Sequence, residues 1–229
     1  MRGPTEYDAI ATRYAAGVDE RPWNALYERP ATLALLPELA GLDVLDAGCG
    51  HGWYAEYFLD HGARVTGIDR SERMVDIARQ RLGKRARLIH GDMSDLQLLG
   101  DASFDLIVSP LVIHYIENLR QMFAEWARVL RPNRTIVFST HNPARTATVV
   151  ERGTLFPTLV EEAWPWLNQK MRYYQRSLRD ITEPLTKAGF AIERIDEPTP
   201  SEALRQKDPK GFERLTKLPA FIFVRAHKP

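Results

Sequence analysis

The chain has few of the features that mark secreted, membrane-spanning or strongly charged proteins. It holds one cysteine, Cys49, so no disulfide can form within it. Lys and Arg number 31 against 30 for Asp and Glu, and the net charge of +1 gives no field that would draw the chain onto nucleic acid or a membrane. No apolar run approaches the roughly 20 residues of a spanning helix. The first ten residues, MRGPTEYDAI, lack a secretory pattern, so we expect a cytoplasmic protein that uses neither nucleic acid nor membrane.

Short apolar runs alternate with helical patterns along the 229 residues, a length that suits one domain. The predicted strands are residues 44–47, 64–68, 86–89, 104–108, 135–139, 190–195 and 220–226. The predicted helices are residues 53–61, 71–82, 119–130 and 178–188. Strands joined by helical crossovers form parallel sheets, so the order predicts a doubly wound α/β fold with its ligands at the carboxyl ends of the strands.

Two regions depart from this alternation. Residues 1–40 mix aromatic and charged side chains before a predicted helix from Pro30 to about Leu39, and we interpret them as a helical cap on the core of residues 41–139. Residues 140–178 are too long for an ordinary connection, and we expect this insertion to lie on the substrate side. Residues 179–229 then supply a last helix and two strands.

A glycine-rich turn lies between the first strand and the next helix, in VLDAGCGHGWYAEYF at residues 44–58. Gly48, Gly50 and Gly52 allow a ligand close to the backbone, and the helix that follows presents free amide groups to it. The string GHGWYA also satisfies the dinucleotide pattern, with Asp69 at the downstream distance expected for ribose hydroxyls. The glycines alone therefore leave a nicotinamide dinucleotide open as the ligand.

The glycine turn is the first of three strings that belong together: DAGCGHG at residues 46–52, GIDRSERMVDIAR at 67–79 and GDM at 91–93. Together they resemble the class I methyltransferases that use S-adenosylmethionine. The stretches YDAIATRY and YERPATLALLP are similar to the small-molecule branch related to ubiquinone and menaquinone biosynthesis methyltransferases. The resemblance implies a Rossmann-like, seven-stranded, mostly parallel sheet with an antiparallel last strand, a helical N-terminal cap and an insertion after strand 5.

The resemblance also implies an activity, namely methyl transfer from S-adenosylmethionine to O, N or C of a small metabolite, aromatic ones included, with S-adenosylhomocysteine as product. The alternatives are a tRNA or nucleotide methyltransferase and, third, a nicotinamide-dinucleotide-binding protein. A basic face typical of RNA binding is not predicted at a net charge of +1, and SPLV at 109–112 replaces the Asn-Pro-Pro-Tyr-type element of many base methyltransferases. The expected partner is a small-molecule acceptor, the expected assembly is a monomer or homodimer, and no metal site is predicted.

Each cofactor residue is carried over from the matching motif position. The predicted set is Tyr14, Asp46, Gly48, Gly50, Gly52, Asp69, Asp92, Met93 and Ser109. Asp46 would support the loop or accept from the ammonium group, and Asp69 would hold both ribose hydroxyls. Asp92 would accept from the adenine amino group, the amide of Met93 would meet a ring nitrogen, and Ser109 would pass beneath the methionine end.

Candidate catalytic and substrate residues follow the fourth and fifth strands and occupy the insertion. His114 and His141 are predicted at carboxyl-end positions, with a pKa range suited to accepting a proton. A histidine placed like His114 is more often a packing residue than a catalyst, and a turn role explains His141 equally well. The predicted substrate wall is Tyr115, Trp164, Tyr173 and Tyr174. Both charge signs are mixed locally, so we interpret the nearby arginines as surface residues: Arg145, Arg152 and Arg172.

Overall fold

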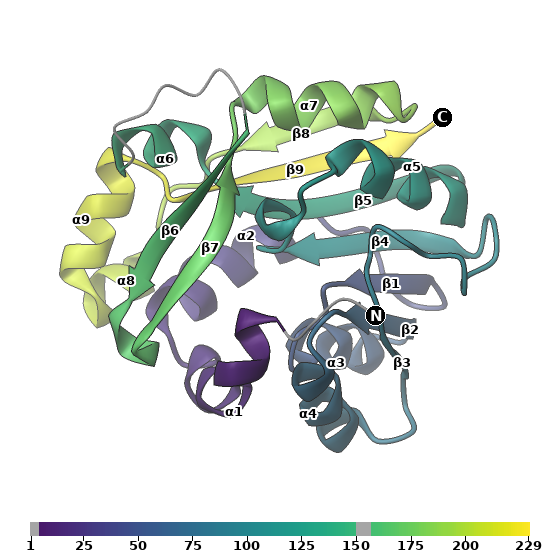
Figure 1. Cartoon of the computed structure of the whole chain (residues 1–229), viewed down its shortest axis with the longest axis horizontal. Coiled ribbons are helices and arrows are strands. Elements are labelled where there is room, and N and C mark those ends of the chain that lie inside the picture. Colours follow the sequence, from purple (N-terminus) through teal and green to yellow (C-terminus); the bar gives the residue numbers. More distant parts are fainter. Residues whose placement is uncertain (1–4, 150–156) are drawn as a thin grey trace.

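One seven-stranded sheet organises the chain (Figure 1). The computed structural model describes residues 5–149 and 157–229. The sheet order is β3-β2-β1-β4-β5-β9-β8. The strand bounds are β1 Asp43–Ala47, β2 Arg64–Asp69, β3 Arg87–His90, β4 Phe104–Pro110, β5 Leu130–His141, β8 Ala191–Asp196 and β9 Phe221–Lys228. Strands β1 to β5 pair in parallel, while β9 runs antiparallel to both β5 and β8, so the predicted sheet is confirmed.

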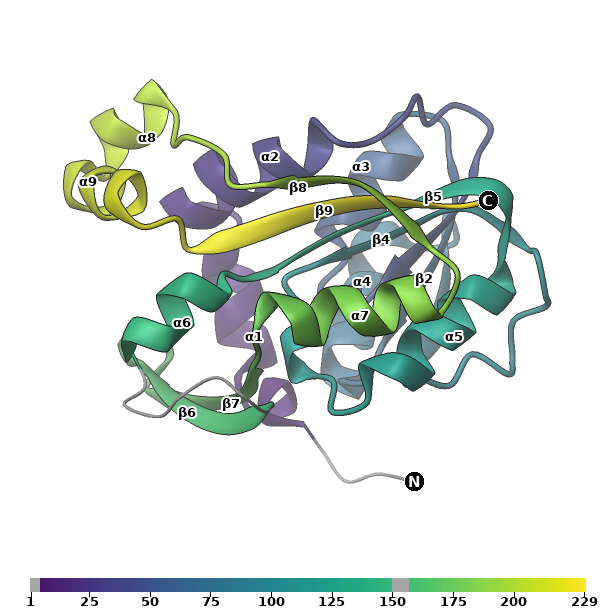
Figure 2. The same cartoon turned by 90° about the horizontal axis from the view of Figure 1, so that it is seen from above.

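Helices cover both faces of this sheet, as Figure 2 shows from above. Helices α5 and α7 pack on one face, and α2, α3 and α4 lie on the other side. Their bounds are α2 Arg29–Leu33, α3 Trp53–Asp60, α4 Glu72–Leu82, α5 Leu119–Val129 and α7 Leu178–Lys187. Because each face of the sheet is covered, β1 and β4 are buried almost throughout, which explains their continuous apolar runs.

Local sequence explains where the core helices begin and which side they bury. The Ser71 hydroxyl accepts a hydrogen bond from the Met74 amide at 3.2 Å and so caps the start of α4. Along α5 the apolar side chains recur every three or four residues, and all of them are buried against the sheet: Leu119, Met122, Phe123, Trp126 and Val129. The predicted helical spacing over 119–130 is therefore confirmed.

Two connections differ from the predictions. The helix expected from Pro30 to Leu39 is wrong in its end, because α2 stops at Leu33 and follows the short π-helix η1, Asn24–Glu28. Pro37 has no amide hydrogen and disfavours a helical conformation at the residue before it, so the helix cannot continue through this segment. The connection before β9 is also more regular than expected, since it contains α8 (Glu202–Lys207) and α9 (Pro209–Lys217).

The cap and the insertion meet at the carboxyl ends of the parallel strands (Figure 1). The cap contributes α1, Glu6–Val18, and the insertion contributes α6, Pro143–Val149, with a separate antiparallel hairpin. That hairpin pairs β6, Thr158–Trp164, with β7, Gln169–Gln175, through the 3-10 turn η3 at Pro165–Leu167. Residues 150–156 of the insertion, Arg152 included, lie outside the described residues. Within the described ranges, no helix is both long and apolar enough to cross a membrane.

Candidate active site

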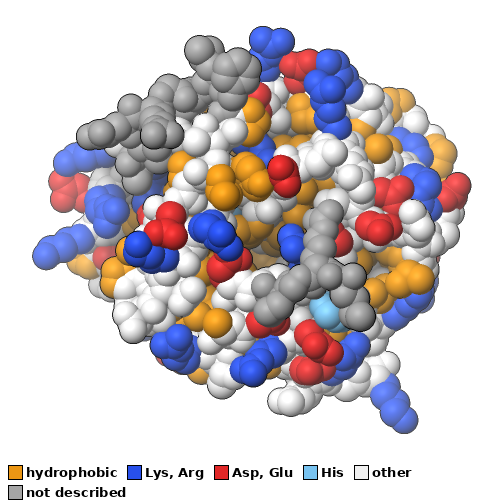
Figure 3. Space-filling model, viewed as in Figure 1, with side chains coloured by type: hydrophobic (Ala, Val, Ile, Leu, Met, Phe, Trp, Pro, Cys, Tyr) orange, Lys and Arg blue, Asp and Glu red, His pale blue; other side chains and the backbone are white. Residues whose placement is uncertain are grey.

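A cavity of about 880 Å³ opens at the carboxyl ends of β1, β2, β4 and β5. Its walls come from the glycine turn, α1, η1, the hairpin and the start of α9. In Figure 3 hydrophobic side chains gather around a hollow near the centre of this face. Ligand cavities in proteins commonly measure about 300 to 1,000 Å³, so this one lies near the upper end and has room for two molecules side by side.

The three glycines of the turn have left-handed φ values, and each meets different surroundings. A Cβ atom at Gly48, where φ is +86°, would lie 2.5 Å from Cγ2 of Val112. At Gly52, where φ is +87°, it would press on Ala78 and Leu82 of α4, so this glycine permits helix packing and does not itself line the cavity. A Cβ at Gly50 would meet no atom within 4 Å. Gly48 therefore leaves room for the Val112 side chain, whereas Gly50 faces open space, and both residues line the cavity.

Asp69 ends β2 directly beside this turn. Its carboxylate accepts hydrogen bonds from the amide of Gly50 through Oδ2 and from the amide of Ser71 through Oδ1, both at 2.8 Å. Burial raises the pKa of Asp69, although the two amide donors act in the opposite direction. Each oxygen keeps a second lone pair, and the residue lines the cavity, so the carboxylate is both fixed in place and able to accept from a ligand.

Asp46 lies on the adjacent strand and has no comparable partner. Its side chain is buried, and neither carboxylate oxygen has a hydrogen-bond partner in the described part of the chain. Burial, and then the charge of Asp69, raise the pKa of Asp46 to about 8. A buried carboxyl without partners is costly. Since Asp46 lines the cavity, a cationic or hydrogen-donating ligand would satisfy it.

The predicted residues beyond Asp69 divide between the cavity and the protein interior. Met93 lines the cavity together with Ile68 and Gly91, and the three form an apolar slot. Asp92 does not line it; its Oδ1 accepts from the amide of Ser94 at 2.9 Å in a local turn, and Arg70 lies 3.8 Å from Oδ2. Ser109 is fully buried and donates to the carbonyl of Ala47 at 2.7 Å. We expected Ser109 to contact the cofactor. Its hydroxyl group does not reach the cavity, because it is buried and bonds β4 to β1.

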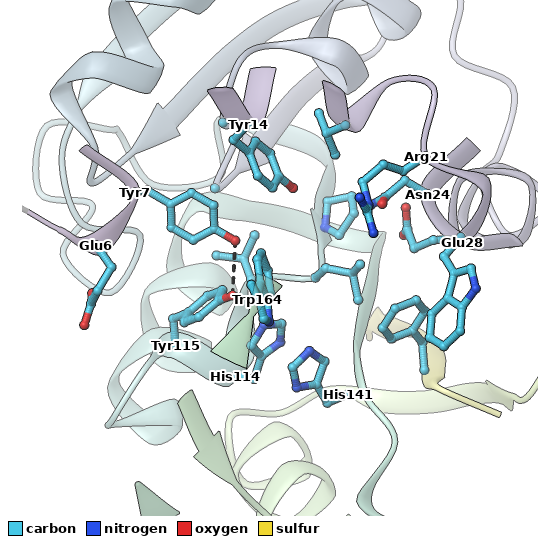
Figure 4. A pocket seen from close by; sticks show the side chains of 18 of the residues that line it. Glu6, Tyr7, Tyr14, Arg21, Asn24, Glu28, His114, Tyr115, His141 and Trp164 are labelled. Atoms are coloured by element: carbon cyan, nitrogen blue, oxygen red, sulfur yellow. Dashed lines mark hydrogen bonds between the residues drawn. The ribbon is translucent and has the colours of Figure 1, made fainter. Parts of the chain in front are cut away.

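Helix α1 places a group of tyrosines over the cavity (Figure 4). The hydroxyl groups of Tyr7 and Tyr115 lie 3.1 Å apart, and the Tyr7 ring meets those of Tyr14 and Tyr115 edge to face. Burial raises the pKa of Tyr14 to about 12, so this side chain stays uncharged. The hydroxyl of Ser71 donates to Asp8 at 2.7 Å, which joins α1 to the start of α4. Tyr14 and Tyr115 both line the cavity, and the cofactor contact predicted for Tyr14 and the substrate contact predicted for Tyr115 stay predictions.

The two candidate histidines stack on each other where β4 and β5 end (Figure 4). The ring centroids of His114 and His141 are 3.9 Å apart with the planes 14° from parallel, and Nδ1 of His114 lies 3.3 Å from the Thr140 hydroxyl. Burial lowers the pKa of His141 to about 3, and burial together with the adjacent His141 lowers the pKa of His114 well below its usual range. Both rings line the cavity and are neutral at physiological pH.

The hairpin carries four aromatic residues, and three of them line the cavity. Trp164, Trp166 and Tyr174 line the cavity. Tyr173 does not: it is buried behind the wall, where its hydroxyl donates to Glu162 at 3.2 Å and its ring meets His141 edge to face. The prediction of Tyr173 as a substrate contact is therefore corrected, because successive side chains of β7 point to opposite faces of the strand.

A buried carboxyl group in η1 was missed by the sequence interpretation. Glu28 lines the cavity and accepts hydrogen bonds from the hydroxyls of Thr32 at 2.7 Å, Ser139 at 2.8 Å and Tyr54 at 2.8 Å. Burial raises its pKa, although these three donors lower it in part. The available signal was a Glu-Arg pair inside an otherwise apolar segment, since charged residues in such a setting need specific partners.

The adjacent Arg29 belongs to a second network that the sequence did not reveal. Asp19 at the end of α1 accepts from Arg29, His51 and Arg81, with the shortest contact of each between 2.5 and 3.0 Å. Burial alone would raise the pKa of Asp19, but these donors outweigh it and leave the pKa well below its usual range. The network joins the end of α1 to α2, to α4 and to His51 of the glycine turn.

Comparison with known proteins identifies the family. The profile described as "Methyltransferase domain" matches residues 45–138. An uncharacterized protein of Haemophilus influenzae is 30% identical over 90% of this chain and 88% of its own length. A malonyl-[acyl-carrier protein] O-methyltransferase of Pectobacterium atrosepticum is 37% identical over 47% of this chain, which spans only 42% of that protein.

A solved structure matches nearly the whole chain. The S-adenosylmethionine dependent methyltransferase from Mesorhizobium loti is 30% identical, covers 93% of this chain and 100% of its own, and superposes with a TM-score of 0.75. This likeness settles the choice that the glycines left open between two cofactors, and it confirms S-adenosylmethionine over a nicotinamide dinucleotide. The chain belongs to the family of S-adenosylmethionine-dependent methyltransferases.

Proposed function

We propose that the chain transfers a methyl group from S-adenosylmethionine to O, N or C of a small acceptor held in the cavity. The observation that carries the proposal is one continuous space of about 880 Å³ that joins the glycine turn to an aromatic-lined region under the hairpin. The turn end suits the cofactor, and the remaining volume is bordered by α1, the hairpin and α9. A cavity of this size suits a small metabolite better than a nucleotide within folded RNA.

The cofactor end is assigned to residues of β1, β2 and the two connections after them. Asp69 would accept from ribose hydroxyls with the lone pairs that Gly50 and Ser71 leave unused. Asp46 would receive the ammonium group, because its carboxyl lines the cavity and lacks a partner among the described residues. Met93 with its apolar neighbours would hold the adenine ring. Asp92 would contribute mainly by shaping this turn, since its Oδ1 accepts from the Ser94 amide.

S-adenosylmethionine brings an activated methyl group, so the protein's main task is to align the acceptor and take up its proton. His141 lies in the cavity wall as a neutral ring and can accept a hydrogen bond from an acceptor hydroxyl or amine. Its low pKa makes it a weak base. We therefore assign His141 chiefly to orientation of the acceptor, with His114, held at Thr140, supporting it from behind.

Further parts of the proposal concern the setting in which the protein acts. One buried, unpaired cysteine suits the reducing cytoplasm. A small acceptor requires no second subunit for the cavity walls described above, and we propose a monomer or a homodimer.

The test uses labelled methyl transfer. Purified protein is incubated with methyl-labelled S-adenosylmethionine and either the low-molecular-weight fraction or the RNA fraction of a bacterial extract. We expect label in small molecules, and a loss of at least tenfold in cofactor affinity for Asp69→Ala, which removes charge-assisted hydrogen bonds of about 1.5 to 3 kcal/mol each. Label found only in RNA would reverse the choice of acceptor. Failure to bind S-adenosylmethionine would remove the cofactor assignment.

A further inference from the structure

The arginines that line the cavity fall into two groups by their partners. Three of them form ion pairs with carboxylates, and these are Arg29 with Asp19, Arg70 with Asp92 and Arg172 with Glu6. Within residues 5–149 and 157–229, no carboxylate forms an ion pair with the three others, which are Arg21, Arg145 and Arg214. This corrects the interpretation of Arg145 as an ordinary surface residue.

Each of the three unpaired guanidinium groups lies near a tryptophan ring of the cavity wall. Arg21 stacks over the ring of Trp166, with Cζ 4.0 Å from the ring centroid. Arg145 from α6 and Arg214 from α9 each lie 5.4 Å from the ring of Trp23. Figure 4 shows Arg21 extending into the cavity on the same side as Glu28. This end of the cavity therefore offers cations and flat aromatic faces together.

Acidic residues at the same end are engaged with other donors. Glu28 accepts from three hydroxyls, Glu162 accepts from the hydroxyl of Tyr173, and Asp208 accepts from Nε1 of Trp23 at 3.1 Å and from the amide of Gly211 at 2.9 Å. They moderate the local positive charge without pairing with the three arginines.

Arg21 and Arg145 are only half exposed, and holding a guanidinium out of water without a counter-charge costs stability. Burial lowers the pKa of Arg21, which is the direction expected for a cation that lacks an acid partner. A ligand that brings the missing negative charge would offset this cost. Arg214 and Lys210 are exposed at the rim and add positive charge along the entrance.

We propose that the acceptor molecule carries an anionic group, a carboxylate or a phosphate, which Arg21 and Arg145 bind while Trp23 and Trp166 contact its flat or apolar part. The inference rests on the proposed function, because it names the substrate class of the same site. Arg214 would draw the anion toward this position. The methyl-accepting atom then lies on the part of the molecule nearer to His141.

The test measures binding of three probes to protein saturated with S-adenosylhomocysteine, so that the cofactor region is closed to them. The probes are benzoate, phenyl phosphate and the neutral benzamide, titrated while tryptophan fluorescence is followed, at low and high sodium chloride. We expect at least one anion to bind roughly tenfold more tightly than benzamide, with an affinity that falls as salt rises. The two anions separate a carboxylate site from a phosphate site, and preference for either supports the proposal.

Variants of Arg21 and Arg145 test whether these two side chains bind the anion. Arg21→Gln and Arg145→Gln should each lower the affinity for the preferred anion by roughly tenfold, while the affinity for S-adenosylhomocysteine stays unchanged. Arg179→Gln is the matched control, because this exposed arginine on α7 pairs with Glu183 and does not line the cavity. Equal binding of all three probes, or anion binding that survives in both variants, overturns the inference while methyl transfer still supports the proposed function. Failure of S-adenosylhomocysteine to bind overturns the proposed function instead.

Discussion

Asp46 is the residue whose replacement tests most directly how the cofactor end works. The folded chain buries this carboxyl and raises its pKa to about 8, whereas the ordinary value is 3.8. Between these values the folded state keeps a proton that the unfolded state has released. The contribution of Asp46 to stability is therefore fully present below about pH 4 and is lost as the pH rises through 8. Asp46→Asn removes the titration and keeps the shape of the side chain.

The size of the effect follows from the pKa difference. Each unit corresponds to about 1.36 kcal/mol, so the contribution of Asp46 to the free energy of unfolding falls by up to about 4 kcal/mol between pH 5 and pH 8. An asparagine in the same place leaves a buried amide whose cost does not change over this range. The difference in stability between the wild type and Asp46→Asn therefore reports the titration of Asp46 together with its coupling to Asp69.

The assay is urea denaturation of both proteins at half-unit steps from pH 5 to pH 8.5, in the absence of cofactor. We expect the wild type to lose stability relative to Asp46→Asn as the pH rises, and the affinity of the wild type for S-adenosylmethionine to increase over the same range. An ammonium group beside Asp46 favours the ionised form, so binding releases a proton and strengthens by up to about tenfold per pH unit below 8. Parallel stability curves would refute the reasoning, because they would mean that Asp46 is already ionised in the folded protein.

Three further changes test other parts of the site. Gly48→Ala should destabilise the protein by at least about 1 kcal/mol more than the control Gly83→Ala, as measured by urea denaturation. Both variants place an alanine at a left-handed φ, but only the new Cβ at position 48 also collides with Val112. Equal losses of stability in the two variants would contradict this close contact. His141→Gln should reduce the loss of stability at low pH. In the wild type the pKa of His141 is lowered to about 3, so between pH 7 and pH 5 only the unfolded state takes up a proton at this residue, which lowers the free energy of unfolding by about 2 kcal/mol. Denaturation curves whose pH dependence is unchanged by the variant would show that this ring is not buried in neutral form. Asp8→Ala should lower stability by about 1 kcal/mol through the lost cap of α1 and should weaken cofactor binding several-fold, as measured by thermal unfolding and titration; unaltered affinity would separate α1 from the cofactor site.

The sheet and the glycine turn could be predicted because their signals are local. A strand covered on both faces needs a continuous apolar run, as in β1 and β4, and a helix on the sheet needs apolar residues every three or four positions, as in α5. The positive φ values at the turn require glycine at positions that can be counted in the sequence. Asp69 could be placed for the same reason, since it ends the next strand.

The acceptor region could not be predicted in this way, because its residues meet only through tertiary packing. Trp23 lies near both Arg145 and Arg214, which are separated from it by more than a hundred positions of sequence. Side-chain direction was the second obstacle. Ser109 follows the predicted strand 104–108 and Tyr173 lies in the predicted insertion, but the hydroxyl of Ser109 bonds to β1 and the ring of Tyr173 lies behind the cavity wall. Neighbouring side chains on a strand point to opposite faces, so an error of one residue moves a side chain from the cavity to the interior, and sequence spacing alone did not determine which face each residue occupies.

Helix α1 connects the two halves of the site. Its Asp8 bonds to the cap of α4 beside Asp69, and its Tyr7 bonds to Tyr115 in the acceptor wall. The cofactor half is built from consecutive strands and turns, while the acceptor half depends on this helix, the hairpin and α9 coming together. Because α1 forms part of the cofactor wall and of the acceptor wall, a change that loosens this helix must weaken the binding of both ligands. A change at Arg21, which follows α1, or at Arg145 on α6 should weaken binding of the acceptor alone.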